Sequence, residues 1–324
     1  MSWHKNVCNS TIRDQSILMN NLDLSIIIVS FNTRDLLRET ISSIYKTANT
    51  LSYEIIVVDN ASSDGSPEMV EAEFKEITLV RNKENVGFAK GNNQGMKMAS
   101  GEYLLLLNSD TLLKDGTVET LVKFMDQHPR AAGVGPKVLN FDGTLQSKGF
   151  CFPSVLLSLI ILFRIPKVLS QEKLMKWFSK YYWDEDEVRR VDWISGCCLL
   201  MKRNTIEGIG PLCEDFFMYY EDEEWCFRAK KSKFEVWYVP TAEVKHKSES
   251  SPLKDRFDIG NMSAKKYYEK TVGSYKGIVI AIIYIVSSMI KLIRHSIQSK
   301  RTEEYKDTRK RLRLQIRFLR SMLL

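Results

Sequence analysis

The sequence has little that would direct the chain out of the cell or through a bilayer. Its first 21 residues are polar and contain no apolar core of the kind that a secretory signal peptide needs. The six cysteines form no C-x-x-C pair, and Cys197 and Cys198 are adjacent, which favours reduced cytosolic thiols over disulfides. Gly277–Ile290 is apolar for 14 residues, short of the roughly 20 that a spanning helix needs. These absences argue against signal-peptide secretion, a disulfide scaffold and a simple transmembrane anchor.

Positive charge is concentrated at the C-terminal end. The formal net charge is +7, but residues 290–324 contain 11 Lys and Arg against 3 Asp and Glu, so the rest of the chain is close to neutral. A basic tail beside an apolar stretch indicates an anionic membrane surface as partner, and no nucleic acid is expected.

From Leu24 onward, short apolar runs alternate with segments of helical spacing. The expected strands are Leu24–Ser30, Glu54–Asp59, Ile77–Val80 and Tyr103–Leu107, and the helices after the first three are Arg34–Thr47, a helix ending at Phe74, and Phe88–Ala99. Strands that are apolar throughout and separated by helices form a parallel sheet covered on both faces. The sequence therefore predicts an α/β fold with a mostly parallel, twisted sheet.

The last helix, near Tyr305–Leu324, has an apolar stripe flanked by arginines. The stripe is Leu312, Ile316, Leu319 and Leu323, and the arginines are Arg309, Arg313, Arg317 and Arg320. Such a helix lies in the membrane interface rather than crossing it, so residues 256–324 are expected to form a helical membrane-associating appendage. The alternative is a core helix followed by an exposed basic segment. Val155–Ile165 is a second, isolated apolar stretch.

The first strand ends in Ser30-Phe31-Asn32-Thr33 and lacks a glycine-rich turn. A dinucleotide-binding fold or a P-loop needs that turn, so its absence argues against a dehydrogenase and a kinase. After the second strand, the Asp59 carboxylate can accept a hydrogen bond from N3–H of uracil or thymine. The alternative is that Asp59 and Asp64 only shape a turn or cap the next helix.

The fourth strand runs into Asn108-Ser109-Asp110, and oxygen ligands there suit Mg²⁺ or Mn²⁺ bound to a diphosphate. The preceding segment Asn85–Asn93 supplies glycines and amides suited to close contact with a sugar nucleotide. The alternatives are an ordinary strand-end turn and a loop before a helix.

Two later features also suggest chemistry. Asp222 falls among aromatics at the start of the expected helix Glu221–Ser232, which makes it a candidate general base, unless the acids form a solvated helix face. His246 follows the expected strand Glu235–Val239 and is either a ligand or a structural histidine.

Taken together, these segments resemble the family-2 inverting glycosyltransferases of the GT-A fold, especially the rhamnosyltransferase-like branch acting on bacterial surface polysaccharides. The resemblance covers roughly Leu24 to Ser250. It is carried by VSFN, VVDNASSDGS, NVGFAKGNNQG, LLLLNSD, VDWISGCCLLMKR and FMYYEDEEWCFR, in the family's order and spacing. It implies a catalytic domain over 22–255, with a nucleotide-sugar half (22–135) and an acceptor half (136–255), after a polar tail over 1–21.

The resemblance also implies roles for single residues. Asp222 would be the base, with Glu221 beside it, and Asp110 and His246 would bind a divalent metal, N-S-D replacing the family's usual D-x-D. The implied donor-binding residues are Ser30, Asn32, Asp59, Asn85, Gly87, Asn92, Asn108, Ser109 and Asp110, and the implied acceptor-side residues are Trp193, Ser195 and Gly196.

The implied activity is an inverting transfer of rhamnose or another hexose from a dTDP- or UDP-sugar to an acceptor hydroxyl. The acceptor would be a lipid-linked glycan in cell-surface polysaccharide assembly, such as O-antigen, at the cytoplasmic face of the membrane, with the protein peripheral or monotopic. One rival is a sugar nucleotidyltransferase, for which a glycine-rich, basic segment near the N-terminus is missing. Another is a degenerate GT-A scaffold that assembles other enzymes.

Overall fold

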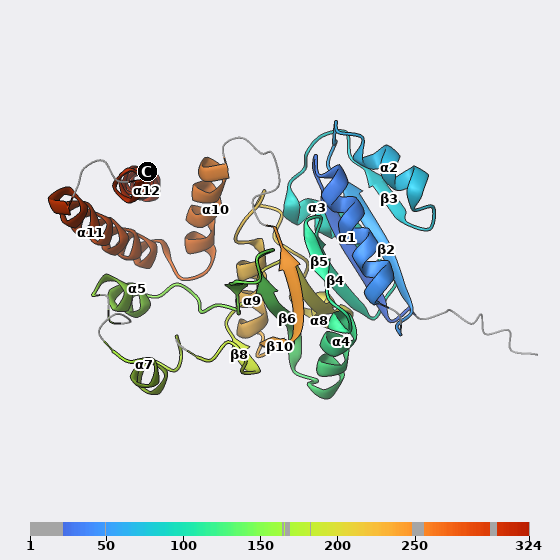
Figure 1. The fold of residues 1–324 in the computed structure, drawn as a ribbon, viewed down its shortest axis with the longest axis horizontal. Coiled ribbons are helices and arrows are strands. Elements are labelled where there is room, and N and C mark those ends of the chain that lie inside the picture. The colour runs from blue at the N-terminus through green and yellow to red at the C-terminus, as the bar shows by residue number, and fades with distance from the viewer. Residues whose placement is uncertain are drawn as a thin grey trace, which may run out of the picture.

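A computed structural model describes residues 22–48, 50–163, 165, 169–181, 183–247, 256–298 and 303–323 (Figure 1). The expected N-terminal tail, residues 1–21, lies outside the described residues. The strands are β1 Leu24–Ser30, β2 Tyr53–Asp59, β3 Thr78–Arg81, β4 Tyr103–Asn108, β5 Thr111–Leu113, β6 Ala131–Leu139, β7 Leu145–Ser147, β8 Arg189–Val191, β9 Cys198–Lys202 and β10 Glu235–His246. The helices are α1 Arg34–Thr47, α2 Ser66–Glu73, α3 Phe88–Met98, α4 Thr117–Gln127, α5 Val155–Leu162, α7 Gln171–Trp177, α8 Arg203–Ile209, α9 Glu221–Lys231, α10 Arg256–Lys270, α11 Ser274–Gln298 and α12 Glu303–Leu323.

Among the described residues, the strands form one mixed sheet with the main order β3-β2-β1-β4-β9-β6-β10-β5. The N-terminal strands β3, β2, β1 and β4 are mutually parallel, as the alternating sequence predicts. Beyond them, β9 is antiparallel to both β4 and β6. The antiparallel strand β9 comes from the Cys198–Lys202 segment, which sequence periodicity did not identify as a strand.

Two hydrophobic layers hold the sheet between helices. On one face, Leu37 and Ile41 of α1 and Leu121 of α4 pack on alternate strand residues such as Ile26 and Leu105. On the other face, Ala89 and Met96 of α3 and Trp225 of α9 pack on Ile27, Leu104 and their neighbours. Because successive strand side chains point to opposite faces, strands that are apolar throughout supply apolar side chains to both layers.

Strand β10 is longer than the sequence predicts. It does not end at Val239 but continues to His246, with irregular pairing to β6 between Val239 and Glu243. Its last residues pair antiparallel with β5, which sets His246 opposite Thr111. Since Thr111 directly follows Asp110, this pairing carries the histidine to the end of β4.

The C-terminal helices α10, α11 and α12 gather beside the sheet, with α5 next to α11 (Figure 1). They share a hydrophobic cluster with the main body, in which Phe216 packs with Tyr267, Tyr268, Ile280 and Met322. The inward residues of α12 include Phe318 and Met322, while the predicted stripe residues Ile316 and Leu323 are 37% and 65% exposed. Helix α12 is therefore packed against its neighbours rather than free.

The expectation that the apolar C-terminal stretch is too short to span a bilayer is wrong for the helix as a whole. Within α11, Ser274–Ile293 is long and apolar enough to cross a membrane by length and composition, and 28% of that window is buried. The stretch lengthens because the helix continues at both ends past Gly277 and Ile290.

Candidate active site

The carboxyl ends of β1, β2 and β4 meet at one edge of the sheet. There a cleft of about 420 Å³, here called the strand-end cleft, collects residues from both halves of the sequence. Its lining includes Asn85, Gly87, Asn108, Ser109, Asp110, Gln146, Phe150, Trp193, Ser195, Gly196, Asp222, His246 and Arg256. Ligands of open α/β sheets bind at this edge, so the cleft is the candidate ligand site.

Four of the predicted donor residues, Ser30, Asn32, Asp59 and Asn92, are not part of this lining in the part of the chain that the structure describes. Asp59 nevertheless has a carboxylate oxygen that can accept a hydrogen bond from a ligand. Its Oδ2 accepts a hydrogen bond from Ser62 N–H (2.9 Å), whereas its buried Oδ1 has no partner among the described residues. Burial raises the pKa of this carboxyl.

Ser30 and Asn32 organise the loops around the cleft. The hydroxyls of Ser30 and Thr33 lie 3.0 Å apart, and Thr33 donates to the Ser109 hydroxyl (2.9 Å), which links the end of β1 to the N-S-D segment. Asn32 has a φ of 53°, and its Oδ1 accepts from Ser63 N–H (2.7 Å). These side chains hold the segments that follow β1, β2 and β4 in place.

The Asn85–Gly87 turn closes against the segment that precedes the acids. Asn85 Oδ1 accepts from Gly87 N–H (3.0 Å), and Phe88 N–H donates to the Phe217 carbonyl (2.6 Å). Gly87 has a φ of 88°, and a Cβ there would lie 2.4 Å from the Phe217 carbonyl oxygen, so only glycine fits. Asn92 is 1% exposed and donates to the Phe88 carbonyl (2.9 Å), a structural contact.

The predicted metal residues lie together at the end of β4. His246 Nε2 is 3.2 Å from Asp110 Oδ1 and 3.2 Å from Asn108 Nδ2. The Oδ1 of Asn108 is buried and has no hydrogen-bond partner among the described residues. Two atoms bound to one small cation at about 2.1 Å and at right angles lie about 3 Å apart, so the His246–Asp110 separation fits a pair of ligands.

Gln146 fixes the histidine's tautomer. Its Nε2 donates to Asn140 Oδ1 (2.8 Å) and to the His246 carbonyl (3.0 Å), so its Oε1 faces His246 Nδ1 at 2.7 Å. Nδ1 therefore carries the proton, which leaves the Nε2 lone pair directed at Asp110 in the neutral ring.

The site offers a metal only a small protein ligand set. In the described part of the chain, no group of three or more His, Cys, Asp and Glu side chains comes together as a metal site. Asp110 and His246 fit a divalent cation whose remaining ligands come from a diphosphate and water, the arrangement that Mg²⁺ usually adopts with phosphates.

Helix α9, which carries the candidate base, begins after a strained turn. Tyr219 and Tyr220 have φ values of 72° and 70°, in a region that residues with a Cβ rarely adopt. Consecutive strain of this kind persists only where surrounding packing enforces it and is common at active sites. It sets the direction in which Glu221 and Asp222 enter the site.

Two backbone hydrogen bonds hold Asp222, the predicted general base. Its Oδ2 accepts from Gly196 N–H (2.7 Å) and its Oδ1 from Glu223 N–H (2.8 Å). Burial raises the pKa of Asp222, and burial followed by the Asp222 charge raises the pKa of Glu221 well above its ordinary value. The pKa of Glu221 is thus raised further by the Asp222 charge, whereas the backbone hydrogen bonds from Gly196 and Glu223 favour the ionised form of Asp222.

The predicted acceptor-side residues face this acid. Gly196 holds it by the backbone contact above, and Ser195 lines the cleft next to it. Trp193 stacks on Phe150 with ring centroids 4.1 Å apart and an interplanar angle of 18°. The Trp193–Phe150 pair forms an aromatic wall that suits the apolar face of a sugar.

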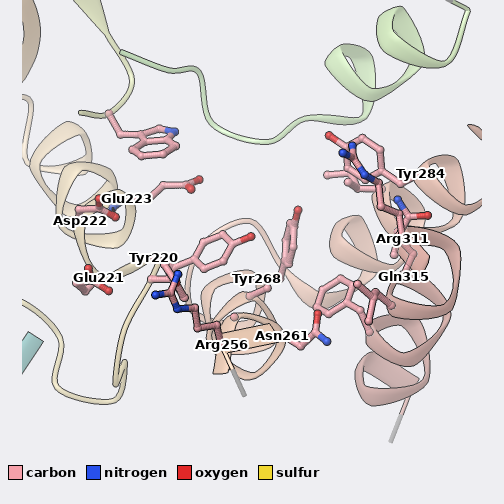
Figure 2. A pocket seen from close by; sticks show the side chains of 18 of the residues that line it. Tyr220, Glu221, Asp222, Glu223, Arg256, Asn261, Tyr268, Tyr284, Arg311 and Gln315 are labelled. Atoms are coloured by element: carbon pink, nitrogen blue, oxygen red, sulfur yellow. Dashed lines mark hydrogen bonds between the residues drawn. The ribbon is translucent and has the colours of Figure 1, made fainter. Parts of the chain in front are cut away.

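A second, larger space opens on the other side of the acids. It measures about 940 Å³ and is here called the helical cavity, because α10, α11 and α12 complete its walls (Figure 2). Asp222 lines both the strand-end cleft and the helical cavity, whereas Glu221 lines only the cavity. Asp222 therefore stands where a molecule in the cavity meets one in the cleft.

Several of these residues were not singled out from the sequence. Gln146 lies in no motif, and its contact with His246 joins residues 100 positions apart. Phe150 had no motif to mark it. The cavity residues of α10 to α12, including Arg256 and Tyr268, belonged to a region interpreted as a membrane appendage. For Tyr219 and Tyr220, aromatics flanking an acid run were the one available signal.

The chain is similar in sequence to known glycosyltransferases. The family model "Glycosyl transferase family 2" matches residues 25–172. An N-acetylglucosaminyl-diphospho-decaprenol L-rhamnosyltransferase of Mycobacterium tuberculosis is 28% identical over 215 residues, 62% of this chain and 68% of the relative. The low-salt glycan biosynthesis hexosyltransferase Agl10 of Haloferax volcanii is 26% identical over 242 residues, 74% of this chain and 71% of the relative.

Among solved structures, the mannosyltransferase PcManGT of Pyrobaculum calidifontis, in complex with GDP-Man and Mn²⁺, superposes with a TM-score of 0.53. The two are 16% identical, and the match covers 94% of this chain and 86% of that one. At this identity the likeness establishes the fold, a mixed α/β sheet flanked by helices of the GT-A type.

Proposed function

The chain carries a glycosyl transferase family 2 domain and is a glycosyltransferase, and we propose that it is an inverting enzyme in which Asp222 activates the acceptor hydroxyl. The observation that carries this proposal is the position of Asp222 on the boundary between the strand-end cleft and the helical cavity. A donor in the cleft and an acceptor in the cavity would meet at this carboxylate.

The chemistry is a single in-line displacement at the anomeric carbon. Asp222 removes the acceptor proton while the new bond forms, a role worth about 10²–10⁴ in rate. The raised pKa of its buried carboxyl makes it a stronger base than an exposed aspartate. Since one base acts and no side chain serves as nucleophile, the anomeric configuration inverts.

The diphosphate leaving group lies at Asp110 and His246 in this proposal. These residues would hold Mg²⁺ or Mn²⁺, which, when bound, neutralises the charge that grows on the diphosphate. The Gln146 contact keeps the His246 Nε2 lone pair available for that role. The Mn²⁺ in the PcManGT complex supports a divalent cation.

The donor we propose is a dTDP- or UDP-linked hexose, rhamnose being the first candidate. The free, buried Oδ1 of Asp59 supports recognition of N3–H on uracil or thymine. Similarity to an L-rhamnosyltransferase supports the sugar, and the diphospho-decaprenol in that relative's name supports a lipid-linked glycan as acceptor in surface polysaccharide assembly.

Apolar surface on α5 and α11 supports action at a membrane. The two helices pack together, and both expose large apolar side chains. These include Leu156 (55%), Phe163 (68%), Ile282 (46%), Met289 (49%) and Ile293 (61%). We propose that this surface enters the cytoplasmic leaflet, with the protein peripheral or monotopic.

A spanning orientation of α11 is disfavoured by its neighbour. Helix α12 packs along α11 and carries Arg309, Arg313, Arg317 and Arg320, all exposed. Crossing the bilayer would take these charges into hydrocarbon at a cost of about 2.5–3.5 kcal/mol or more each. In the interfacial orientation the same arginines face anionic headgroups.

Two experiments test the proposal. Incubation with dTDP-rhamnose or UDP-hexoses and Mn²⁺ should give slow donor hydrolysis, and addition of a lipid-linked acceptor should give sugar transfer. Release of pyrophosphate instead would indicate a nucleotidyltransferase. Full-length protein should also float with anionic vesicles at low salt. If it stays at the bottom of the gradient, the apolar surface serves assembly rather than membrane binding.

A further inference from the structure

The helical cavity has walls of opposite charge. On α9 it is lined by Glu221, Asp222 and Glu223, and across from them stands Arg311 on α12 (Figure 2). Lys310 also lines the cavity, and both cations are exposed, so they belong to its solvent-facing edge. Arg256 of α10 also lines the cavity, and Arg311 pairs with Asp307 at 2.9 Å. Lys310 and Arg311 can donate charge-assisted hydrogen bonds to an anion at the cavity edge, whereas the buried acids can accept a hydrogen bond from a hydroxyl.

Unpaired polar atoms line the same space. Glu221 Oε2 and Glu223 Oε1 have no hydrogen-bond partner among the described residues, and both side chains are 4% exposed. On the opposite helices, Asn261 Nδ2 and Gln315 Oε1 are likewise buried without a partner in the described chain. Buried polar groups are nearly always satisfied, so these four atoms would pair with polar groups of a bound molecule or with water.

The remaining lining is largely apolar. Ile280, Ala281 and Tyr284 of α11 and Leu314 and Phe318 of α12 contribute to it. Helix α11 thus presents one face to the cavity and another to the outside, where Ile282 and Met289 are exposed. At about 940 Å³, the cavity lies near the top of the range of roughly 300–1,000 Å³ for ligand sites, which leaves room beyond a single sugar.

We propose that the helical cavity is the acceptor site and that α10 to α12 hold the part of the acceptor linking the sugar to its lipid. Lys310 and Arg311 bind a phosphate at the cavity edge, and the α11–α12 walls contact the first part of an apolar chain. The acceptor sugar then reaches Asp222 with the hydroxyl that is glycosylated. This inference rests on the proposed function and adds that the C-terminal helices select the acceptor.

The test replaces cations on the cavity edge and, as a matched control, cations outside it. Lys310→Ala/Arg311→Ala is compared with Lys291→Ala/Lys306→Ala, which removes two charges from α11 and α12 away from the cavity lining. Assays in a nonionic detergent without phospholipid use two acceptors, an alkyl-diphosphate-linked sugar and the same sugar as a methyl glycoside.

The cavity-edge variant should raise the KM for the diphosphate-linked acceptor about 10-fold or more, because charge-assisted phosphate contacts are lost. Its kcat/KM for the methyl glycoside and its donor hydrolysis should stay unchanged, which also shows that it folds. The control variant should match wild type with both acceptors.

Three results would overturn the inference. The cavity-edge variant could lose activity equally with both acceptors, or the two double variants could lose activity equally. The loss of activity could also appear only in phospholipid vesicles, which would assign the cations to lipid headgroups. Ala281→Phe gives an independent measurement, because the larger side chain narrows the cavity at its apolar wall. This variant should reduce transfer to the long-chain acceptor more than transfer to the methyl glycoside. If wild type neither hydrolyses a donor nor transfers to either acceptor, the proposed function itself fails, which is a separate outcome.

Discussion

Replacing Asp222 by asparagine is the sharpest test of the catalytic assignment. The substitution keeps the size of the side chain but removes the base, so transfer should fall by about 10²–10⁴. Donor affinity should change little, because the base acts on the acceptor hydroxyl rather than on the nucleotide. Isothermal titration with the nucleotide diphosphate and an assay of its release during transfer measure the two quantities separately.

The structure also predicts a stability effect for this variant. Both carboxylate oxygens of Asp222 accept backbone N–H groups, from Gly196 and Glu223, and an amide can accept only one of them. The lost contact costs about 1–3 kcal/mol. Since burial raises the pKa of Asp222, removing a buried charge offsets part of that cost. A small fall in melting temperature is expected, far too small to explain the loss of transfer.

Glu221→Gln is the matched comparison. Glu221 lines the helical cavity but not the strand-end cleft, and its Oε2 has no partner among the described residues. Because its pKa is raised well above the ordinary value, glutamine resembles the protonated acid already present. This variant should transfer at near the wild-type rate. Near-normal transfer by Asp222→Asn together with an inactive Glu221→Gln would show that the wrong acid has been named.

Three further predictions concern the metal, its support and the third acid. EDTA should abolish transfer, and Mg²⁺ or Mn²⁺ should restore it. Asp110→Ala should remain folded but lose metal-dependent donor binding in titrations. Full activity in metal-free protein would refute the metal assignment. Gln146→Leu should weaken Mn²⁺ binding in the presence of nucleotide diphosphate by about 10–100-fold, because His246 Nδ1 loses its acceptor. Unchanged binding would show that metal binding by His246 does not depend on Gln146. Burial raises the pKa of Glu223 from its ordinary 4.5 to about 8, so the folded state holds a proton that the unfolded state releases, and stability falls as pH rises between those values. The melting temperature of Glu223→Gln relative to wild type should therefore be higher at pH 8 than at pH 5. A difference in melting temperature that does not depend on pH would contradict the raised pKa.

The sequence determined the N-terminal half of the fold almost residue by residue. Strand β1 and helix α1 have the predicted bounds, and β2, β3, α3 and β4 differ by only one or two residues. Their apolar runs and helical spacings are local signals that need no distant contact to be read. The same signals placed Asp59 and Asp110 near strand ends, on the same edge of a parallel sheet.

Only the tertiary structure decided what depends on contacts between distant segments. The pairing of β10 with β5 places His246 beside Asp110, and Gln146 fixes its tautomer across 100 residues. The C-terminal helices, interpreted from composition as an appendage, also wall the cavity at Asp222, because their inward residues pack on Phe216 and Tyr268. Periodicity reveals that a helix has an apolar face but not which surface that face covers, and here the helices close a cavity that Asp222, the predicted base, lines.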